Sequence, residues 1–475
     1  MGFIKKYNQE ITLGLFCIGM FCYALGLSSF GKSLKTQTLF HIGGLLFIVY
    51  NYRLFSKALW KILSVPICCF AIVCLLGILT IFDDVWVRQV SVVLKSVNQH
   101  IVGYFVLFVF MFLFGMYGKV KYVFFFLVIF ALLCVLEVCS TIYLGLKNGF
   151  LNTAANIPFF FQAVFTYNIW LIAPASMSLA GVFVFKKWTY KILSFIGLIL
   201  SLLAILANGE RSFLVAFVAM LPIPFFAWQY KHKLKVLLFV LCAGIAFVVG
   251  FYHISKSFSD RYNFSHMVNN FAVVWNTKPI EMGQYDSACF ANANWIQCAP
   301  ESLVLGQNEI TWEHSSLSRI NMTKSTLLAV ADAPFKPHIV GVFQIGEYLW
   351  DYYNIQNHQN RSYINFESDS NNKNTNGYNS PHNFAVSLLF SYGVIGFVCI
   401  VVFQFFLLYS GYRCMQKQEY RWKSFWGLSL IIFVCGICIQ SFFDVLYVHI
   451  LQCIFIWCGV VVGLGWRDEN PTNNQ

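Results

Sequence analysis

Charged side chains are scarce in this sequence. Only 11% of its 475 residues are Asp, Glu, Lys or Arg, whereas 58% are hydrophobic and the mean hydropathy is +0.65. Soluble domains contain about 25% charged residues. A chain this poor in charge cannot keep its apolar surface inside one water-soluble core, so we expect an all-α protein that crosses a membrane many times.

Several motifs that bind metals or nucleotides are also absent. The sequence has no HExxH, no paired CxxC motifs and no DxD in its long polar connection, and it has no P-loop or GxGxxG after a strand-like segment. We therefore expect no cofactor, no metal and no direct use of a cytosolic nucleotide. Cys435 and Cys438 form a single CxxC within an apolar run, where two small packing residues are favoured over a metal site.

Apolar runs that are long enough to cross a bilayer as helices recur along the chain. We count about twelve of them by hydropathy. Many others follow the first run, so we interpret it as a span and not as a cleaved signal peptide. The runs cover residues 11–31, 37–52, 62–82, 100–118, 121–145, 164–185, 190–207, 211–229, 234–252, 384–409, 424–445 and 447–465.

Basic residues are concentrated in alternate connections between these runs. The positive-inside rule places these connections in the cytoplasm, together with both termini, which requires an even number of spans. The net charge of +12 is thus a topology signal, and a nucleic-acid interface is disfavoured because the charges are spread over separate short loops. The basic connections contain Lys5/Lys6, Arg53/Lys57/Lys61, Lys119/Lys121, Lys186/Lys187/Lys191, Lys231/Lys233/Lys235 and Arg413/Lys417/Arg421/Lys423.

One connection, residues 253–383, is far longer than the others. Its length suits a small domain, and by alternation it faces outward, which in a bacterium is the periplasm. It is mildly acidic, with about 8 Lys or Arg against about 11 Asp or Glu. The chain therefore divides into a nine-span bundle (1–252), this loop domain (253–383) and a three-span segment with a short cytoplasmic tail (384–475).

Two of the sixteen cysteines, Cys289 and Cys298, lie in this outward loop. An oxidising compartment permits a disulfide between them, and we favour that bond over two free thiols. The other fourteen lie in apolar runs or a cytoplasmic loop, where cysteine behaves as a small hydrophobic residue.

The loops also contain helix-like segments. SSLSRINMTKSTLLAVADAPF has the pattern of an amphipathic helix, with Ser316 or Ser318 as its cap and Pro334 after its end. Residues 339–355 are rich in aromatic side chains, which favours a position against the membrane surface. Residues 83–99, in a shorter outward connection, alternate apolar and polar side chains and suit a second interfacial helix.

Two arginines on the outward side are candidates for function. Glu210 and Arg211 lie between two apolar spans, at membrane depth or at the outer surface, where charged residues are costly and are functional candidates by default. A Glu210–Arg211 pair, or an Arg211 that reaches lipid headgroups, explains them equally well. Arg319, at the start of the amphipathic helix, taken alone is better explained as a solvated or headgroup-binding arginine.

His382 is the third candidate. It stands at the start of a span, between Pro381 and Asn383, at the boundary between a polar loop and an apolar run. A histidine in such a position is usually an interfacial anchor or a helix-capping residue. Its ordinary pKa near 6.5 also suits a general base. Arginine binds phosphate oxygens through a planar fork of donors, so two arginines and a histidine on one side of the membrane indicate phosphate chemistry.

Taken together, four segments resemble the O-antigen ligase family, whose fold is shared with O-antigen polymerases and some protein O-oligosaccharyltransferases. NGERSFLVAF resembles the family's outward arginine at the start of a span. DRYNF, with Arg261, followed by the amphipathic segment resembles the loop helix with the second arginine. HNFAVSLLFSYGVIGF resembles the histidine motif, and SFFDVLY, with Asp444, resembles the aspartate of enteric-type ligases. The resemblance covers most of residues 195–460.

The resemblance implies a metal-independent, inverting glycosyltransferase of the bacterial inner membrane. A glycan on undecaprenyl diphosphate is transferred to a sugar hydroxyl of the lipid A–core in the periplasmic leaflet. Arg211 and Arg319 then bind the diphosphate, and His382 accepts the hydroxyl proton. Asn383, Asp444, Glu210 and Arg261 are candidates for substrate binding, although Asp444 is equally well explained as a membrane-edge carboxylate. The glycines of the histidine motif, Gly393 and Gly396, are interpreted as structural.

The chain departs from the family pattern in two places. Glu210 replaces the small or polar residue that usually precedes the first arginine, and the loop is lengthened around Cys289 and Cys298. Three other functions remain open: an O-antigen polymerase, a protein O-oligosaccharyltransferase and, from a different class, a secondary transporter. A transporter is disfavoured because the sequence has neither two related halves nor interrupted spans.

Overall fold

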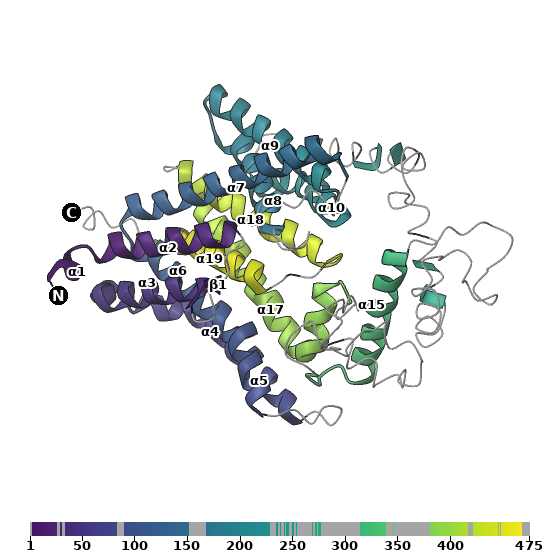
Figure 1. Ribbon diagram of the computed structural model, residues 1–475, viewed down its shortest axis with the longest axis horizontal. Coiled ribbons are helices and arrows are strands. Elements are labelled where there is room, and N and C mark those ends of the chain that lie inside the picture. Colours follow the sequence, from purple (N-terminus) through teal and green to yellow (C-terminus); the bar gives the residue numbers. More distant parts are fainter. Residues whose placement is uncertain are drawn as a thin grey trace.

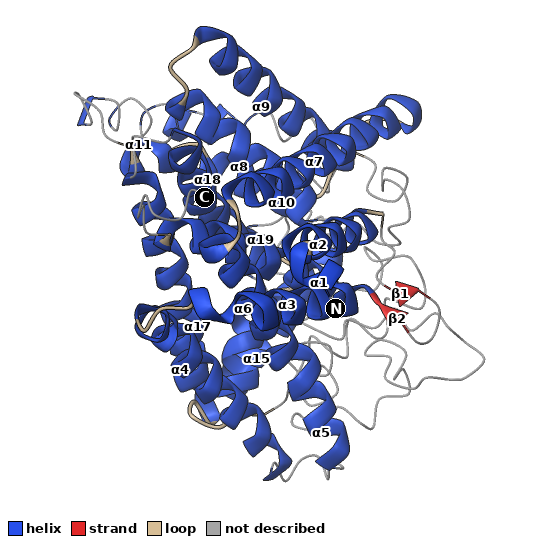
Figure 2. Cartoon of the chain, turned by 90° about the vertical axis from the view of Figure 1, so that its left-hand side faces the viewer, coloured by secondary structure: helices blue, strands red, loops and turns tan. Residues whose placement is uncertain are grey.

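The computed structural model describes residues 2–25, 29–30, 34–82, 90–151, 168–228, 314–338, 381–416, 421–444 and 448–467, together with Ile345, Leu446 and isolated residues between 234 and 276. Helices form nearly all of this part of the chain (Figure 2). The exception is a two-residue antiparallel ribbon, β1 (Ser29–Phe30) with β2 (Leu34–Lys35). The predicted all-α class is therefore confirmed for the described residues.

Apolar helices occupy the first half of the chain, close to the predicted runs. They are α1 (Gly2–Lys6), α2 (Asn8–Ala24), α3 (Thr36–Asn51), α4 (Ala58–Leu79), α5 (Val90–Val97), α6 (Gly103–Tyr117), α7 (Val120–Asn148), α8 (Asn168–Val184), α9 (Trp188–Asn208), α10 (Arg211–Met220) and α11 (Ile223–Ala227). Single turns, η1 (Tyr52–Leu54) and η2 (Thr80–Phe82), follow α3 and α4, and a π-helical segment, η3 (Asn98–Val102), joins α5 to α6.

The second half contributes four long helices. They are α15 (His314–Asp332), α17 (Phe384–Gln416), α18 (Arg421–Ser441) and α19 (Val448–Trp466). Helix α15 is the predicted loop helix. It begins before both Ser316 and Ser318, so the predicted cap is wrong, whereas Pro334 follows its end as expected. It lies at one end of the helical bundle (Figure 1).

The centre of the bundle is packed by large aromatic side chains and close helix crossings. Phe130 of α7 contacts both Trp170 of α8 and Trp457 of α19, with ring centroids 5.7 and 5.5 Å apart. Glycines let α6 and α19 approach each other, since a Cβ on Gly459 would lie 2.7 Å from the carbonyl oxygen of Phe108. Small residues at helix contacts are typical of packing inside membranes.

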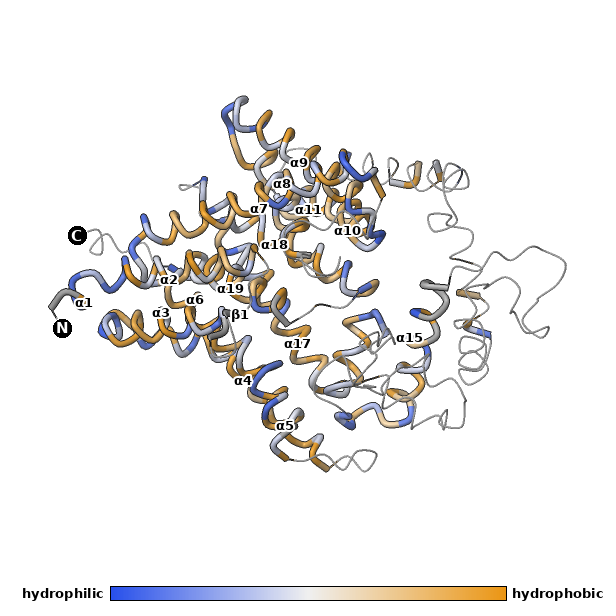
Figure 3. The backbone as a smooth tube through the Cα atoms, viewed as in Figure 1, coloured by the Kyte–Doolittle hydropathy of each residue, from blue (hydrophilic) through white to orange (hydrophobic). Residues whose placement is uncertain are grey.

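Hydrophobic residues make up most of the bundle helices (Figure 3), and many of their large side chains are exposed on the outside of the bundle. Trp60, Leu146 and Trp188 are each about 70% exposed (69%, 73% and 73%). Such an exterior suits lipid and not water. Among the described residues, six helices are long and apolar enough to cross a membrane, and three shorter apolar segments lie at 169–184, 211–227 and 450–466. The chain is thus a multi-pass membrane protein, but the predicted count of twelve spans is not confirmed.

The basic connections meet at one end of the bundle. Arg467, after α19, donates to the carbonyl of Gly118, and the backbone of Lys119 donates to the side chain of Gln9 in α2. Arg421, at the start of α18, donates to the carbonyl of Val184 at the end of α8. These contacts bring loops with excess positive charge together, as expected if they share one side of the membrane.

Candidate functional site

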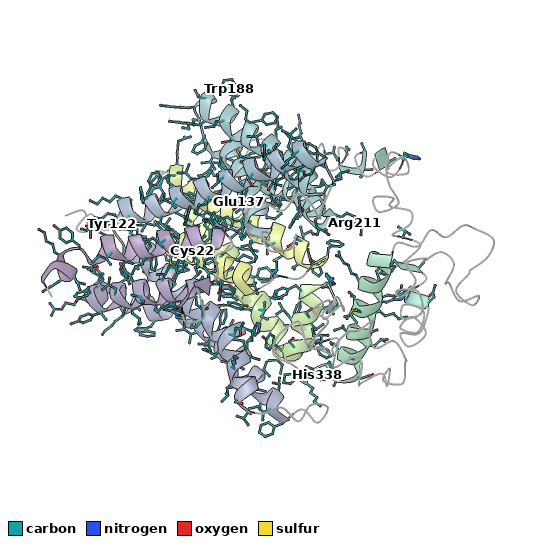
Figure 4. The ribbon with its side chains drawn as sticks, in the orientation of Figure 1. Cys22, Tyr122, Glu137, Trp188, Arg211 and His338 are labelled. Atoms are coloured by element: carbon teal, nitrogen blue, oxygen red, sulfur yellow. The ribbon has the colours of Figure 1, made fainter. Side chains whose placement is uncertain are left out.

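The first part of the site is the sharp turn between α9 and α10. Gly209 ends α9 in the left-handed conformation, with φ of 78°, and a Cβ there would lie 2.6 Å from Cα of Leu151. Only glycine fits such a position without strain. The turn sets Glu210 directly before α10 and makes Arg211 its first residue, at the end of the bundle nearest α15 (Figure 4).

The second part is the junction between α15 and α17. Helix α17 breaks at Gly393, whose φ of 65° and ψ of −179° are accessible in practice only to glycine. The backbone N–H of Val394 donates instead to the carbonyl of Pro334, 2.8 Å away, in the turn after α15. His338 closes the same junction, with its ring stacked on Phe390 at 4.6 Å. The structural interpretation of Gly393 is therefore supported.

His382 lies at the other end of the first segment of α17. Its φ of 48° is unusual for a residue with a side chain and points to a locally strained backbone. Asn383 follows and caps α17, because its side-chain oxygen accepts the backbone N–H of Val386 at 3.0 Å. Thr323 of α15 donates to the carbonyl of Pro381 at 3.1 Å, which ties the loop helix to the histidine segment.

Two contacts between ionisable side chains connect these parts. Nη1 of Arg319 lies 3.6 Å from Oε1 of Glu210, and Nδ1 of His382 lies 3.8 Å from Oδ1 of Asp444. Only 19% of the Arg319 side chain is exposed, so it is not the solvated surface arginine that the sequence alone would favour. Through its contact with Arg319, Glu210 connects the bundle to the loop helix α15.

Asp444 is fully buried and links three helices. Its backbone oxygen accepts the N–H of Phe384 at the start of α17. Its Oδ2 accepts the hydroxyl of Ser212 at 3.4 Å and the side-chain amide of Gln440 at 3.3 Å. A membrane-edge carboxylate facing water would have no such set of contacts, so the structure favours a role for Asp444 within the site.

The environment of His382 keeps its imidazole neutral. Burial, and next the positive charge of Arg319, lower the pKa of His382 to about 3, although Glu210 acts in the opposite direction. At neutral pH the ring therefore carries no charge and has a nitrogen able to accept a proton. A pKa of about 3 makes His382 a weak base. A negative charge beside Arg319 would offset the positive charge of the arginine and so raise the pKa of His382.

An apolar cavity of about 160 Å³ is lined in part by residues that neighbour His382 and Asp444 in the chain. Its wall includes Phe384 and Leu388 of α17, just after His382, and Ser441 and Leu446, on either side of Asp444. It continues between α4, α17 and α19, where the lining is mostly aliphatic and aromatic. The cavity can take an apolar chain whose polar end lies at the charged cluster.

The site thus brings together Glu210, Arg319, His382 and Asp444, with Arg211 adjacent to Glu210 in the chain. Arg261, Cys289 and Cys298 lie outside the described residues. Within the described parts of the chain, no group of three or more His, Cys, Asp or Glu side chains could hold a metal ion.

Two polar residues of the site were not predicted. Ser212 directly follows Arg211, and Gln440 is a buried amide in the last turn of α18, four residues before Asp444. That i, i+4 spacing of two polar side chains in an apolar run was the available signal. Without knowing that α10 meets α18, however, the sequence does not indicate that Ser212 joins them.

Many apolar helices, with a cluster of ionisable side chains at one end of the bundle, define a multi-pass membrane protein. Residues 196–401 match the protein family described as O-Antigen ligase. Residues 196–401 therefore form a domain of the O-antigen ligase family, which confirms the resemblance predicted from the motifs. The matched region contains Glu210, Arg211, Arg319 and His382, whereas Asp444 lies beyond it. No curated protein matches the chain.

Proposed function

We propose that this protein is an O-antigen ligase. It transfers a glycan from undecaprenyl diphosphate to a sugar hydroxyl of the lipid A–core. The observation that carries the proposal is the convergence of an arginine, a neutral histidine and a buried aspartate beside an apolar cavity, inside a domain of this family. The positively charged loops lie at one end of the bundle, so the positive-inside rule supports a periplasmic site in the inner membrane.

The arginines bind the donor. The diphosphate of the lipid carrier is already a good leaving group, so the reaction needs stabilisation of charge and not a nucleotide. Arg319 and Arg211 hold the diphosphate and stabilise the negative charge that grows on it as the bond to the sugar breaks. Glu210, 3.6 Å from Arg319, is the anion that the donor diphosphate displaces from this arginine.

His382 activates the acceptor. The acceptor oxygen forms a bond to the anomeric carbon while the bond between that carbon and the diphosphate oxygen breaks, which inverts the configuration. The hydroxyl proton passes to His382, and Asp444 stabilises the resulting imidazolium. Because the donor diphosphate neutralises Arg319, it raises the pKa of His382 from its value of about 3 in the free site and makes it a stronger base when the donor is present.

The apolar cavity takes the lipid tail. Its wall includes Phe384, two residues after His382, and Ser441 and Leu446, on either side of Asp444, and its lining is mostly apolar. A volume of about 160 Å³ suits only the isoprene units nearest the diphosphate, so the rest of the tail lies in the bilayer. This arrangement places the histidine where a membrane-anchored donor meets an acceptor that faces water.

The lipopolysaccharide profile of a deletion strain tests the reaction. The strain is complemented with the wild-type protein or with His382→Ala. We expect long glycan polymer on the lipid carrier and a bare core in the deletion strain, with the normal ladder restored by the wild-type protein alone. A core that carries a single repeat unit would identify a polymerase instead. An unchanged profile would reject both reactions and direct attention to glycoproteins or transport.

A further inference from the structure

Asp444 is held on both sides, and its two carboxylate oxygens have different partners. Oδ1 faces Nδ1 of His382, while Oδ2 faces Ser212 and Gln440. These two donors come from separate helices, Ser212 from the first turn of α10 and Gln440 from the last turn of α18. They also contact each other, because the Gln440 amide lies 3.4 Å from the Ser212 hydroxyl.

All three side chains are buried. Asp444 and Gln440 are 0% exposed and Ser212 is 3% exposed. A buried carboxylate needs hydrogen-bond donors to remain charged, and the N-terminus of α10 adds a favourable dipole. The two contacts with Oδ2 are long for hydrogen bonds, so each is weak alone, but together they restrict rotation of the carboxylate.

We propose that Ser212 and Gln440 are positioning residues that aim Oδ1 of Asp444 at His382. This inference rests on the proposed function, since it assigns the pair a place in the same reaction. Oδ1 lies 3.8 Å from Nδ1 of His382, and a small approach to hydrogen-bond distance would hold the imidazole proton on Nδ1 and leave Nε2 to accept the proton of the acceptor hydroxyl. If Oδ2 lost its two donors, the carboxylate would rotate and the histidine would lose its orientation.

A double-mutant cycle tests this role in the purified full-length protein, with a lipid-diphosphate-linked glycan as donor and lipid A–core as acceptor. Gln440→Leu is measured in the wild-type background and in Asp444→Asn. We expect Gln440→Leu to lower kcat by between about 10- and 100-fold with little change in the donor KM, the loss expected for one hydrogen bond to a charged group. In the Asp444→Asn background the same substitution is expected to cost almost nothing further.

Two further variants separate positioning from damage to the fold. Ser212→Thr keeps the hydroxyl and is expected to retain most of the activity that Ser212→Ala loses. Gln452→Leu is the matched control, because Gln452 is also a buried glutamine, but in α19 and bonded to Tyr23 and Gln37. If Gln440→Leu costs the same in both backgrounds, the positioning role is wrong. If Asp444→Asn transfers glycan at the wild-type rate, the proposed histidine–aspartate chemistry is itself wrong.

Discussion

At the scale of single residues, the lowered pKa of His382 gives the site a particular pH dependence. With a pKa of about 3 in the free enzyme, the imidazole is already neutral throughout the range from pH 5 to 8. The second-order rate constant kcat/KM reports the free enzyme, so we expect no loss of kcat/KM from His382 as the pH falls from 8 to 5. By contrast, kcat reports the donor complex, in which the pKa is raised, and should fall at a higher pH.

Initial rates between pH 5 and 8, measured with purified protein at varied donor concentration, check this. The rate constants fall toward acidic pH because the protonated imidazole cannot act as a base, and this form becomes populated only below the pKa. A kcat/KM profile that falls with a midpoint near 6.5, the ordinary value for histidine, would show that His382 is not desolvated in the free site.

Glu210 is the residue that departs from the family pattern, and its contact with Arg319 predicts competition with the donor. Removing the carboxylate charge with Glu210→Gln is expected to lower the donor KM by roughly 5-fold, the factor for about 1 kcal/mol from a partly exposed ion pair. The same change removes the buried negative charge that Glu210 holds 3.6 Å from Arg319, so the melting temperature without donor should fall. Asp332→Asn, at the other end of α15, is the matched control. A higher donor KM would instead mean that Glu210 helps to bind the donor.

At the scale of elements, the break in α17 determines where α15 lies. The turn after α15 packs against Gly393, and a Cβ there would lie 3.0 Å from both the carbonyl carbon and the oxygen of Phe335. Gly393→Ala is therefore expected to cost about 1–3 kcal/mol of stability and to move Arg319 away from Glu210 and His382.

Thermal unfolding in detergent and glycan transfer by the same preparation measure both effects. Gly14→Ala in α2 serves as the control, because no atom outside its own helix turn lies within 4 Å of a Cβ there, and alanine favours helix. Wild-type stability and activity in Gly393→Ala would contradict the importance of this junction.

Most helices could be predicted from the sequence, whereas the contacts of the site could not. The run predicted at 37–52 is α3 at Thr36–Asn51, since hydropathy alone determines which segments prefer lipid. The helix with Arg319 was also predicted, from its amphipathic pattern and Pro334. The pairing of Arg319 with Glu210 depends on how α15 docks against the bundle, which local patterns do not encode. For the same reason Ser212 and Gln440 were missed.

At the scale of the whole molecule, the basic loops predict the orientation. Lys119, Arg421 and Arg467 make their contacts at one end of the bundle. His382 lies with Asp444 at the opposite end. Fusions of a fluorescent protein after Lys187 are therefore expected to fluoresce in the cytoplasm, and fusions of alkaline phosphatase after Pro300 to be active in the periplasm. The reverse pattern would place the site on the cytoplasmic side and exclude a periplasmic acceptor.

The proposed chemistry depends on His382 more than on any other side chain. The most direct test compares initial transfer rates of wild type, His382→Ala and the control His41→Ala, whose histidine lies in α3, with purified protein and the same lipid-linked donor and lipid A–core. Loss of a general base predicts a rate lowered by about 10²- to 10⁴-fold in His382→Ala, with donor binding retained by Arg319. Transfer by His382→Ala at the wild-type rate would contradict the proposed mechanism.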